Sequence, residues 1–575
     1  MLKILKPFTI ISCSILLVAC NDDNSKQQTF FQPPTKPIPF NPIESTIDSM
    51  QASIATKGAT CSGIVQSYLN RIEAFDRKGP NLNSVIAINQ EALREAKDLD
   101  NFFQSTGKMK GDLHCVTVLV KDNIDVKGMP TTAGSSALID NYPSRDAFII
   151  KNIKEHGGII LGKTNLDEFA FGYVGKSTVG GQVKNIYDLE KGPGGSSSGT
   201  ATAISGNLAM VGIGTDTGGS IRVPSSLQGL VGLRPSLRLV SQDGIVPLAP
   251  SQDTAGPICR EAIDCAKLTD SLAGFDTSLN SNQRVSFENT SPLLVSSTAY
   301  QTLVNKPTTY APLNSSLVGK HIGLIRGMFP SNDKEEGQLV NKAMNEAITK
   351  LRQAGAIVEE VQVSDLPTIL GEIGYVDSSG QTYGNFSSLS GFEFKQSITK
   401  YLNNSNSKYK SYDDLLNTGQ MIPSFANYNR DFNTNGFSQG YTLNTTIRSP
   451  YVRSRLEAAL NNTTLNGQIQ GARFDALAYP SLVGLVGDLG SSPNAGRNNR
   501  LSAFSGFPAI SIPAATVNSK NFSKYPLNVN IEFIGHEFDE KTLFDIAIPF
   551  QKMNPARLVP SNTPVSYTHL RAHET

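Results

Sequence analysis

Two turns rich in glycine and serine carry the residues best suited to chemistry. The segment Gly192 to Pro235 begins as a Gly/Ser loop at 194–200, continues as a run of small residues expected to be helical, and reaches an apolar strand at 209–214. A second turn, residues 217–220 (TGGS), follows directly. Glycines let the backbone approach a ligand and point successive N–H groups at it, and such N–H groups bind an anion or an oxyanion. The segment therefore offers two serine-bearing turns suited to holding an oxyanion.

Three other interpretations of this segment are weaker. A flexible linker would not alternate with apolar strands. A phosphate-binding loop would show GxxxxGK[ST] or GxGxxG, and neither is present. Residues 195–199 (GSSSG) satisfy G-x-S-x-G, which leaves an α/β-hydrolase esterase using Ser197 as an alternative. That nucleophile elbow needs a strand directly before it, whereas residues 184–194 are polar and turn-rich.

The two turns resemble the signature of a known enzyme family. Residues 194–200 followed by residues 214–222 (GTDTGGSIR) are similar to the amidase signature of a family of serine amidohydrolases. The family also has a lysine far upstream, and Lys121 matches it, 75 residues before Ser196, which itself precedes Ser220 by 24. Other matching pieces are residues 131–135 (TTAGS), 162–169 (GKTNLDEF), 253–257 (DTAGP) and 505–508 (SGFP). The resemblance covers most of residues 43–552 and is weakest in the middle third.

The resemblance implies hydrolysis of a carboxylic amide to an acid and ammonia or an amine, without cofactor or metal. Ser220 would be the nucleophile that forms the acyl-enzyme, Ser196, preceded by a cis peptide bond, would relay protons, and Lys121 would be the base. A lysine base must be neutral, and burial lowers its ordinary pKa of about 10.4. The apolar run Val116 to Val120 before Lys121 is consistent with burial.

The remaining implied roles concern the turns themselves. Ser198 would support the proton relay, and Asp216 with Arg222 would form an ion pair that braces the second turn. The oxyanion hole would consist of the backbone N–H groups of Thr217, Gly218, Gly219 and Ser220.

One departure from the family pattern lies before the lysine. The family usually has His-Gly-hydrophobic-Pro where this chain has residues 114–117 (HCVT). The alternative of a catalytically silent envelope protein that binds a ligand in the same pocket rests on this departure alone. The pattern S-x-x-K at residues 105–108 lacks the companion motifs of penicillin-binding proteins and is interpreted as a loop. His114 and His156 are interpreted as structural, and nothing beyond proximity suggests that Cys115 is a nucleophile.

Composition limits the class of protein. The 575 residues allow a sizeable core, and 51 basic against 50 acidic residues leave a formal charge of +1, without the basic footprint of a nucleic-acid binder. Six histidines and six cysteines, with neither HExxH nor paired CxxC, disfavour a zinc site. Helical patterns at 43–75, 90–103, 147–156 and 337–353 alternate with apolar runs, which predicts an α/β protein with a mostly parallel sheet. The family resemblance implies one large domain, at 43–555, with a mixed, twisted sheet covered by helices on both faces.

Both ends of the chain are expected to lie outside this fold. Residues 1–19 have the basic start and apolar core of a secretory signal peptide, and residues 17–20 (LVAC) resemble a bacterial lipobox. Cys20 would then be lipidated, with 20–42 as a flexible tether, which predicts an extracytoplasmic protein anchored to a bacterial membrane, at its periplasmic face. Residues 565–575 match a translated sequencing adaptor and are interpreted as an artefact.

The predicted extracytoplasmic location affects two further expectations, the class of substrate and the oxidation state of the cysteines. A small-molecule or peptide amide is expected as the substrate, with specificity set in a variable region at about 365–450. The family's tRNA-dependent amidotransferase subunit fits poorly with a secretory signal. Cys61, Cys115, Cys259 and Cys265 would lie in an oxidising compartment, where disulfides are permitted. Cys259 and Cys265 are the nearest pair in sequence, but the sequence does not define the pairing.

Overall fold

The computed structural model describes residues 36–274, 276, 309–311, 315–422 and 435–564. The predicted signal peptide at 1–19, Cys20, the first part of the tether and residues 565–575 lie outside the described residues. Their assignments therefore stay predictions. Among the described residues, we find no helix that combines the length and the apolar character needed to cross a membrane.

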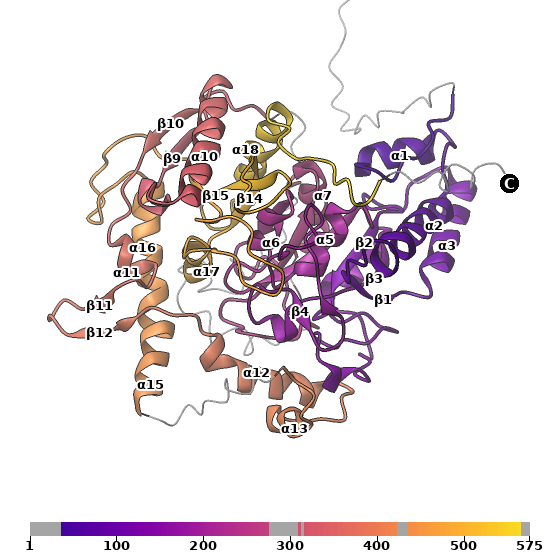
Figure 1. Cartoon of the computed structure of the whole chain (residues 1–575), viewed down its shortest axis with the longest axis horizontal. Coiled ribbons are helices and arrows are strands. Elements are labelled where there is room, and N and C mark those ends of the chain that lie inside the picture. The colour runs from indigo at the N-terminus through magenta and orange to yellow at the C-terminus, as the bar shows by residue number, and fades with distance from the viewer. Residues whose placement is uncertain (1–35, 275, 277–308, 312–314, 423–434, 565–575) are drawn as a thin grey trace, which may run out of the picture.

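The fold is built on one 11-stranded sheet with strand order β1-β3-β2-β6-β8-β7-β14-β15-β13-β9-β10. Figure 1 shows α1, α2 and α3 beside β1–β3 at one end of this sheet and β10 at the other end. The strands are β1 (Val85–Ile88), β2 (Thr117–Lys121), β3 (Ile159–Thr164), β6 (Val211–Asp216), β7 (Val231–Arg234), β8 (Thr254–Cys259), β9 (His321–Leu324), β10 (Ile357–Glu360), β13 (Ala476–Pro480), β14 (Ala509–Val517) and β15 (Leu527–Ile534). Two small hairpins pair β4 (Lys176–Ser177) with β5 (Gly181–Gln182) and β11 (Gly374–Val376) with β12 (Thr382–Asn385).

Helices cover the sheet. They are α1 (Ile47–Ala55), α2 (Cys61–Arg71), α3 (Ala92–Thr106), α4 (Phe148–Glu155), α5 (Ser198–Ser205), α6 (Arg222–Leu227), α7 (Ala262–Leu272), α10 (Glu335–Gln353), α11 (Leu366–Ile369), α12 (Ser390–Asn404), α13 (Tyr412–Asn417), α15 (Asn435–Thr442), α16 (Arg448–Leu460), α17 (Arg500–Ser505) and α18 (Glu540–Met553). The small-residue helix α5 packs against β2 and β6, and α10 and α18 pack against β14. This is the single large α/β domain expected from the resemblance.

The strand directions confirm the mixed sheet that the resemblance implies, and the prediction of a mostly parallel sheet from alternation alone was wrong. β2 runs parallel to both β3 and β6, as the alternation of strands and helices indicated. However, β8 runs antiparallel to β6 and β7, and β14 runs antiparallel to β7 and β15. The turns between these later strands are too weakly patterned in sequence to reveal their direction.

A disulfide joins the two cysteines that lie nearest the lysine strand. Cys61 at the start of α2 bonds Cys115, with 5.2 Å between their Cα atoms, whereas Cys259 and Cys265 are free and buried. Cys115 has φ of +64°, the left-handed conformation that favours glycine, which explains why the family has glycine at this position. The departure in HCVT therefore keeps the backbone shape and adds a covalent link.

An aromatic cluster holds α12 against the body of the domain. Phe394 of α12 packs edge-on against Phe169 and Phe171, with ring centroids 5.6 and 4.8 Å apart, and against Tyr412 of α13 at 5.3 Å. Figure 1 shows α12 and α13 projecting together beyond the sheet. Phe169 and Phe171 belong to the segment that follows β3, so this cluster ties the predicted variable region to the part of the chain that carries the family motifs.

Candidate active site

Lys121 is the last residue of β2 and is fully buried. β2 lies between β3 and β6, so neighbouring strands on both sides help to keep the lysine away from water. Its Nζ donates to Ser196 Oγ at 2.8 Å and to Thr215 Oγ1 at 2.8 Å. The strand thus delivers one amine to the first serine turn and to the end of β6 at once.

This burial changes the chemistry of the lysine. Desolvation lowers the pKa of Lys121 to about 7, although the carboxyl groups of Asp167, Asp216 and Asp253 oppose the shift. A substantial fraction of the side chain is therefore neutral near pH 7. A neutral amine with a hydroxyl at 2.8 Å can accept that hydroxyl's proton.

The first serine turn is shaped by Asp167. The peptide bond between Gly195 and Ser196 is cis, and the Ser196 carbonyl accepts the N–H of Asp167 at 3.2 Å. The Asp167 carboxylate accepts the N–H groups of Val174 and Gly175 at 2.8 to 2.9 Å. A Cβ at position 195 would overlap this carboxylate, so only glycine fits there.

The two serine turns contact each other through the backbone. The N–H of Ser197 donates to the carbonyl of Ser220 at 3.1 Å, and the Ser197 hydroxyl donates to the Thr215 carbonyl at 3.2 Å. This backbone contact places Ser220 next to the turn that carries Ser196, and Ser196 contacts Lys121; all three residues of this cluster are buried. Among the described residues, the Ser220 hydroxyl makes no hydrogen bond to either of the other two side chains. The Ser198 hydroxyl is buried without a hydrogen-bond partner among the described residues, so no contact accounts for its predicted supporting role.

The second turn is organised by the carboxylate of Asp216. Arg222 Nε lies 3.1 Å from Asp216 Oδ2 with both side chains fully buried, which is the predicted ion pair. Arg234 also contacts Asp216, and Arg222 contacts Glu532 at 2.5 Å. Burial alone would raise the pKa of the Asp216 carboxyl, but the two arginines outweigh it and hold the pKa well below its usual range. The turn is thus braced by a buried charge network rather than by one pair.

This bracing changes the predicted oxyanion hole. The N–H of Gly219 donates to Asp216 Oδ1 at 2.7 Å and is therefore already engaged. The N–H groups of Thr217, Gly218 and Ser220 have no acceptor within the part of the chain that the structure describes. Gly219 has φ of +127°, and a Cβ there would lie 2.8 Å from Cβ of Asn499, so its role is to form the turn.

The alternative nucleophile, Ser197, lies in a different setting. Its hydroxyl bonds both the carbonyl and the N–H of Thr215, and residues 183–195 form turns and an isolated bridge at Lys191 instead of a strand. A nucleophile elbow requires a strand leading into an exposed serine. Residues 183–199, all of them described, therefore do not form that elbow.

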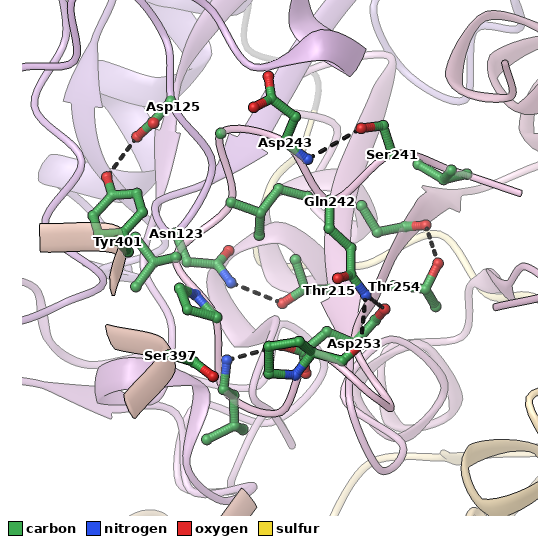
Figure 2. A pocket seen from close by; sticks show the side chains of 18 of the residues that line it. Asn123, Asp125, Thr215, Ser241, Gln242, Asp243, Asp253, Thr254, Ser397 and Tyr401 are labelled. Atoms are coloured by element: carbon green, nitrogen blue, oxygen red, sulfur yellow. Dashed lines mark hydrogen bonds between the residues drawn. The ribbon is translucent and has the colours of Figure 1, made fainter. Parts of the chain in front are cut away.

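A cavity of about 480 Å³ opens beside the cluster. Asn123, Thr215 and Thr217 form part of its lining, and residues 241–248 and α12 contribute more of it, including Ser397 and Tyr401 (Figure 2). Lys121, Ser196 and Ser220 are not lining residues, but Thr215 both lines the cavity and contacts Lys121, so the cavity and the cluster are adjacent. Its volume suits a small-molecule ligand.

The fold is one α/β domain, and its site combines a buried lysine with two serine-bearing turns. A family model described as Amidase matches residues 63–544, and the chain belongs to this family. It is 30% identical over 513 residues to a subunit of the glutamyl-tRNA(Gln) amidotransferase of Clostridium novyi, covering 87% of this chain and 95% of that protein. Its fold is similar to that of a peptide amidase from Stenotrophomonas maltophilia, with a TM-score of 0.72, 28% identity and coverage of 91% and 99% of the two chains. An amidase family protein from Bacillus anthracis has the same TM-score and identity, with coverage of 90% and 93%.

The sequence analysis did not predict the roles of three residues of the site. Asp167 lies inside residues 162–169, which were quoted for the resemblance, and Asn123 follows Lys121 by two positions, but nothing in their spacing marks a contact with the first serine turn or with Thr215. Thr215 precedes the second turn, where the sequence indicates only the end of a strand. The roles of all three depend on which strands are neighbours, which the sequence pattern does not define.

Proposed function

We propose that this enzyme hydrolyses a carboxylic amide through an acyl-enzyme on Ser220. The Ser220 hydroxyl attacks the carbonyl carbon, its proton passes to Ser196, and the Ser196 proton passes to neutral Lys121. The tetrahedral intermediate collapses as the proton returns to the leaving nitrogen, which departs as ammonia or an amine. Water then adds to the ester by the same proton path and releases the acid. The observation that carries this proposal is the 2.8 Å hydrogen bond between buried Lys121 and Ser196.

The direct test measures product from a panel of benzamide-like, aliphatic and peptide C-terminal amides. Ser220→Ala should abolish both ammonia release and labelling by a fluorophosphonate, while Ser197→Ala should retain labelling. Labelling of Ser197 instead would identify the esterase alternative. If the folded wild-type protein is not labelled by the fluorophosphonate and hydrolyses no amide, the result would support the alternative of a catalytically silent protein that binds a ligand.

The preferred substrates are a peptide amide or an aryl or alkyl amide. The fold similarity to a peptide amidase supports the first of these. The predicted secretory signal argues against a role as an amidotransferase subunit acting with tRNA, although the sequence is also similar to such a subunit.

We further propose that Cys20 is lipidated and anchors the enzyme outside the cytoplasm, at the periplasmic face. The disulfide between Cys61 and Cys115 supports this location, because disulfides persist in oxidising compartments. Cys20→Ala should move the protein from the membrane fraction to the soluble fraction, and the wild-type protein should carry diacylglycerol on its first residue. Unmodified Cys20 in a cytoplasmic fraction would contradict the proposal.

A further inference from the structure

The cavity beside the cluster contains a polar atom without a partner. Asn123 is 3% exposed and lines the cavity. Its Nδ2 donates to Thr215 Oγ1 at 3.0 Å, while Oδ1 accepts no hydrogen bond from the described residues. Figure 2 shows the amide nitrogen directed at Thr215 and the oxygen directed away from it. A buried acceptor without a donor costs free energy, so this oxygen is suited to a ligand that brings a donor.

The neighbouring polar groups are already satisfied, which isolates this acceptor. Thr217 Oγ1 donates to Asp253 at 2.5 Å, and the same carboxylate accepts the N–H groups of Leu248 and Ala249. Tyr401 of α12 donates to Asp125 at 2.8 Å on another wall. Asn123 Oδ1 is thus a buried acceptor without a donor on the wall that also holds Thr215 and Thr217, where the Thr217 hydroxyl and the Asp253 carboxylate are already engaged.

The cavity lies beside the residues that transfer the proton, and this position indicates whether the acyl half or the amine half of an amide substrate would enter the cavity. In the proposed reaction, Lys121 returns its proton through Ser196 to the leaving nitrogen, so that nitrogen must lie on the lysine side of Ser220. Thr215 contacts Lys121 and lines the cavity. The amine half of an amide would thus extend from the leaving nitrogen into this space.

We propose that the cavity binds the amine half of the substrate and that Asn123 Oδ1 selects amine halves bearing a hydrogen-bond donor. This inference rests on the amidase function proposed above and deepens it. The substrate class it names is N-substituted amides with a polar amine half, in addition to primary amides. A cavity of about 480 Å³ has room for such a group.

A binding measurement tests the cavity without catalysis. Ser220→Ala protein is titrated with 3-amino-1-propanol and with butylamine, which share a charge and a length and differ in one hydroxyl. We expect the alcohol to bind at least about tenfold more tightly, because both amines place an ammonium group where the leaving nitrogen would lie and only the alcohol has a second donor, its hydroxyl, for Asn123 Oδ1. Adding Ser397→Phe, which fills the cavity from α12, should abolish binding, while Asn403→Phe on the exposed side of the same helix should not. Equal binding of the two amines, or binding that survives Ser397→Phe, would overturn the proposal.

A kinetic measurement tests the assignment to a substrate half. The wild-type enzyme should cleave N-(3-hydroxypropyl)benzamide with a kcat/KM at least about tenfold above that for N-butylbenzamide. Asn123→Leu should reduce this ratio to near one whatever its effect on kcat, and Ser397→Phe should lower kcat/KM for the substituted amide at least about tenfold, whereas Asn403→Phe should not. A ratio unchanged by Asn123→Leu would refute the role of Asn123 even if benzamide is hydrolysed. If the wild-type enzyme is not labelled at Ser220 and cleaves no amide, the amidase proposal fails, and the substrate assignment fails with it.

Discussion

The amine of Lys121 lies 2.8 Å from the hydroxyl of Ser196, and both side chains are fully buried. A charged lysine would be costly in this setting, so burial favours the neutral form that can accept a proton. The same geometry connects β2 to the first serine turn and, through Thr215, to the end of β6. The pair and its surroundings can be tested through rate, pH dependence and stability.

Removal of the lysine amine should abolish most of the activity. Lys121→Met keeps the length of the stem but has no proton acceptor, and we expect kcat/KM for a hydrolysed amide to fall roughly 10²- to 10⁴-fold, the usual contribution of a general base. Lys97→Met on the exposed face of α3 is the matched control and should behave as wild type. Circular dichroism establishes that both variants fold. A loss of less than tenfold in folded Lys121→Met would rule out the lysine as the base.

The pH dependence of kcat/KM should have an acid limb near pH 7. Burial lowers the pKa of Lys121 to about 7, and only the neutral amine can act as a base, so activity rises as the pH increases through this value. Below it, the rate should fall about tenfold per pH unit. A limb close to the ordinary lysine pKa of about 10.4 would show that the lysine is not buried as described. Fluorophosphonate labelling of Ser220 should follow the same profile.

The charge of Asp167 should affect the pH at which the acid limb of kcat/KM occurs. Its carboxyl lies under the first serine turn, and burial raises the pKa of this carboxyl to about 7. The fraction that is ionised near pH 7 raises the pKa of Lys121 against the effect of burial. Asp167→Asn retains a carbonyl oxygen for the N–H groups of Val174 and Gly175 and removes the charge. The acid limb should therefore move to lower pH, whereas Asp98→Asn on the exposed face of α3 should leave it in place. A shift to higher pH would contradict the electrostatic role.

The disulfide should stabilise the lysine end of the domain. Cys61 and Cys115 are 54 residues apart, and closing a loop of this length contributes about 4 kcal/mol to the free energy of unfolding in the chain-entropy model. Cys61→Ser with Cys115→Ser should lower the Tm by several degrees, and dithiothreitol should lower the wild-type Tm by a similar amount.

The double variant is also the control for the reductant. Dithiothreitol should not change its Tm, because Cys259 and Cys265 are already free. When the wild-type protein is denatured without reduction and alkylated, Cys259 and Cys265 should be modified, while Cys61 and Cys115 should not. Modification of all four would disprove the bond.

Much of the site could be predicted from local sequence. Gly194, Gly195, Gly199 and Gly219 occupy positions where a side chain would clash or where φ is positive. This requirement for glycine produces a motif that can be recognised in a single sequence. The burial of Lys121 was also predictable, because a run of β-branched residues leads directly to it. Asp216 and Arg222 are close enough in sequence for their ion pair to be expected.

The contacts between distant segments depended on tertiary structure. Which N–H groups remain available around Ser220 is decided by Asp216, which takes the N–H of Gly219, and Asp216 is placed by two buried arginines. The pairing of Cys61 with Cys115 follows from the packing of α2 beside the loop before β2, not from their separation in sequence.

The sequence by itself determined the chemical groups of this protein and their local backbone shapes, because turn geometry and strand burial depend on neighbouring residues. Only the tertiary structure decided the direction of the later strands, the disulfide, the hydrogen bonds around Ser220 and the cavity that ends at Asn123. The strand directions depend on strand order, the disulfide on the packing of α2, the hydrogen bonds around Ser220 on the buried arginines, and the cavity on the packing of α12. These contacts join residues far apart in the sequence.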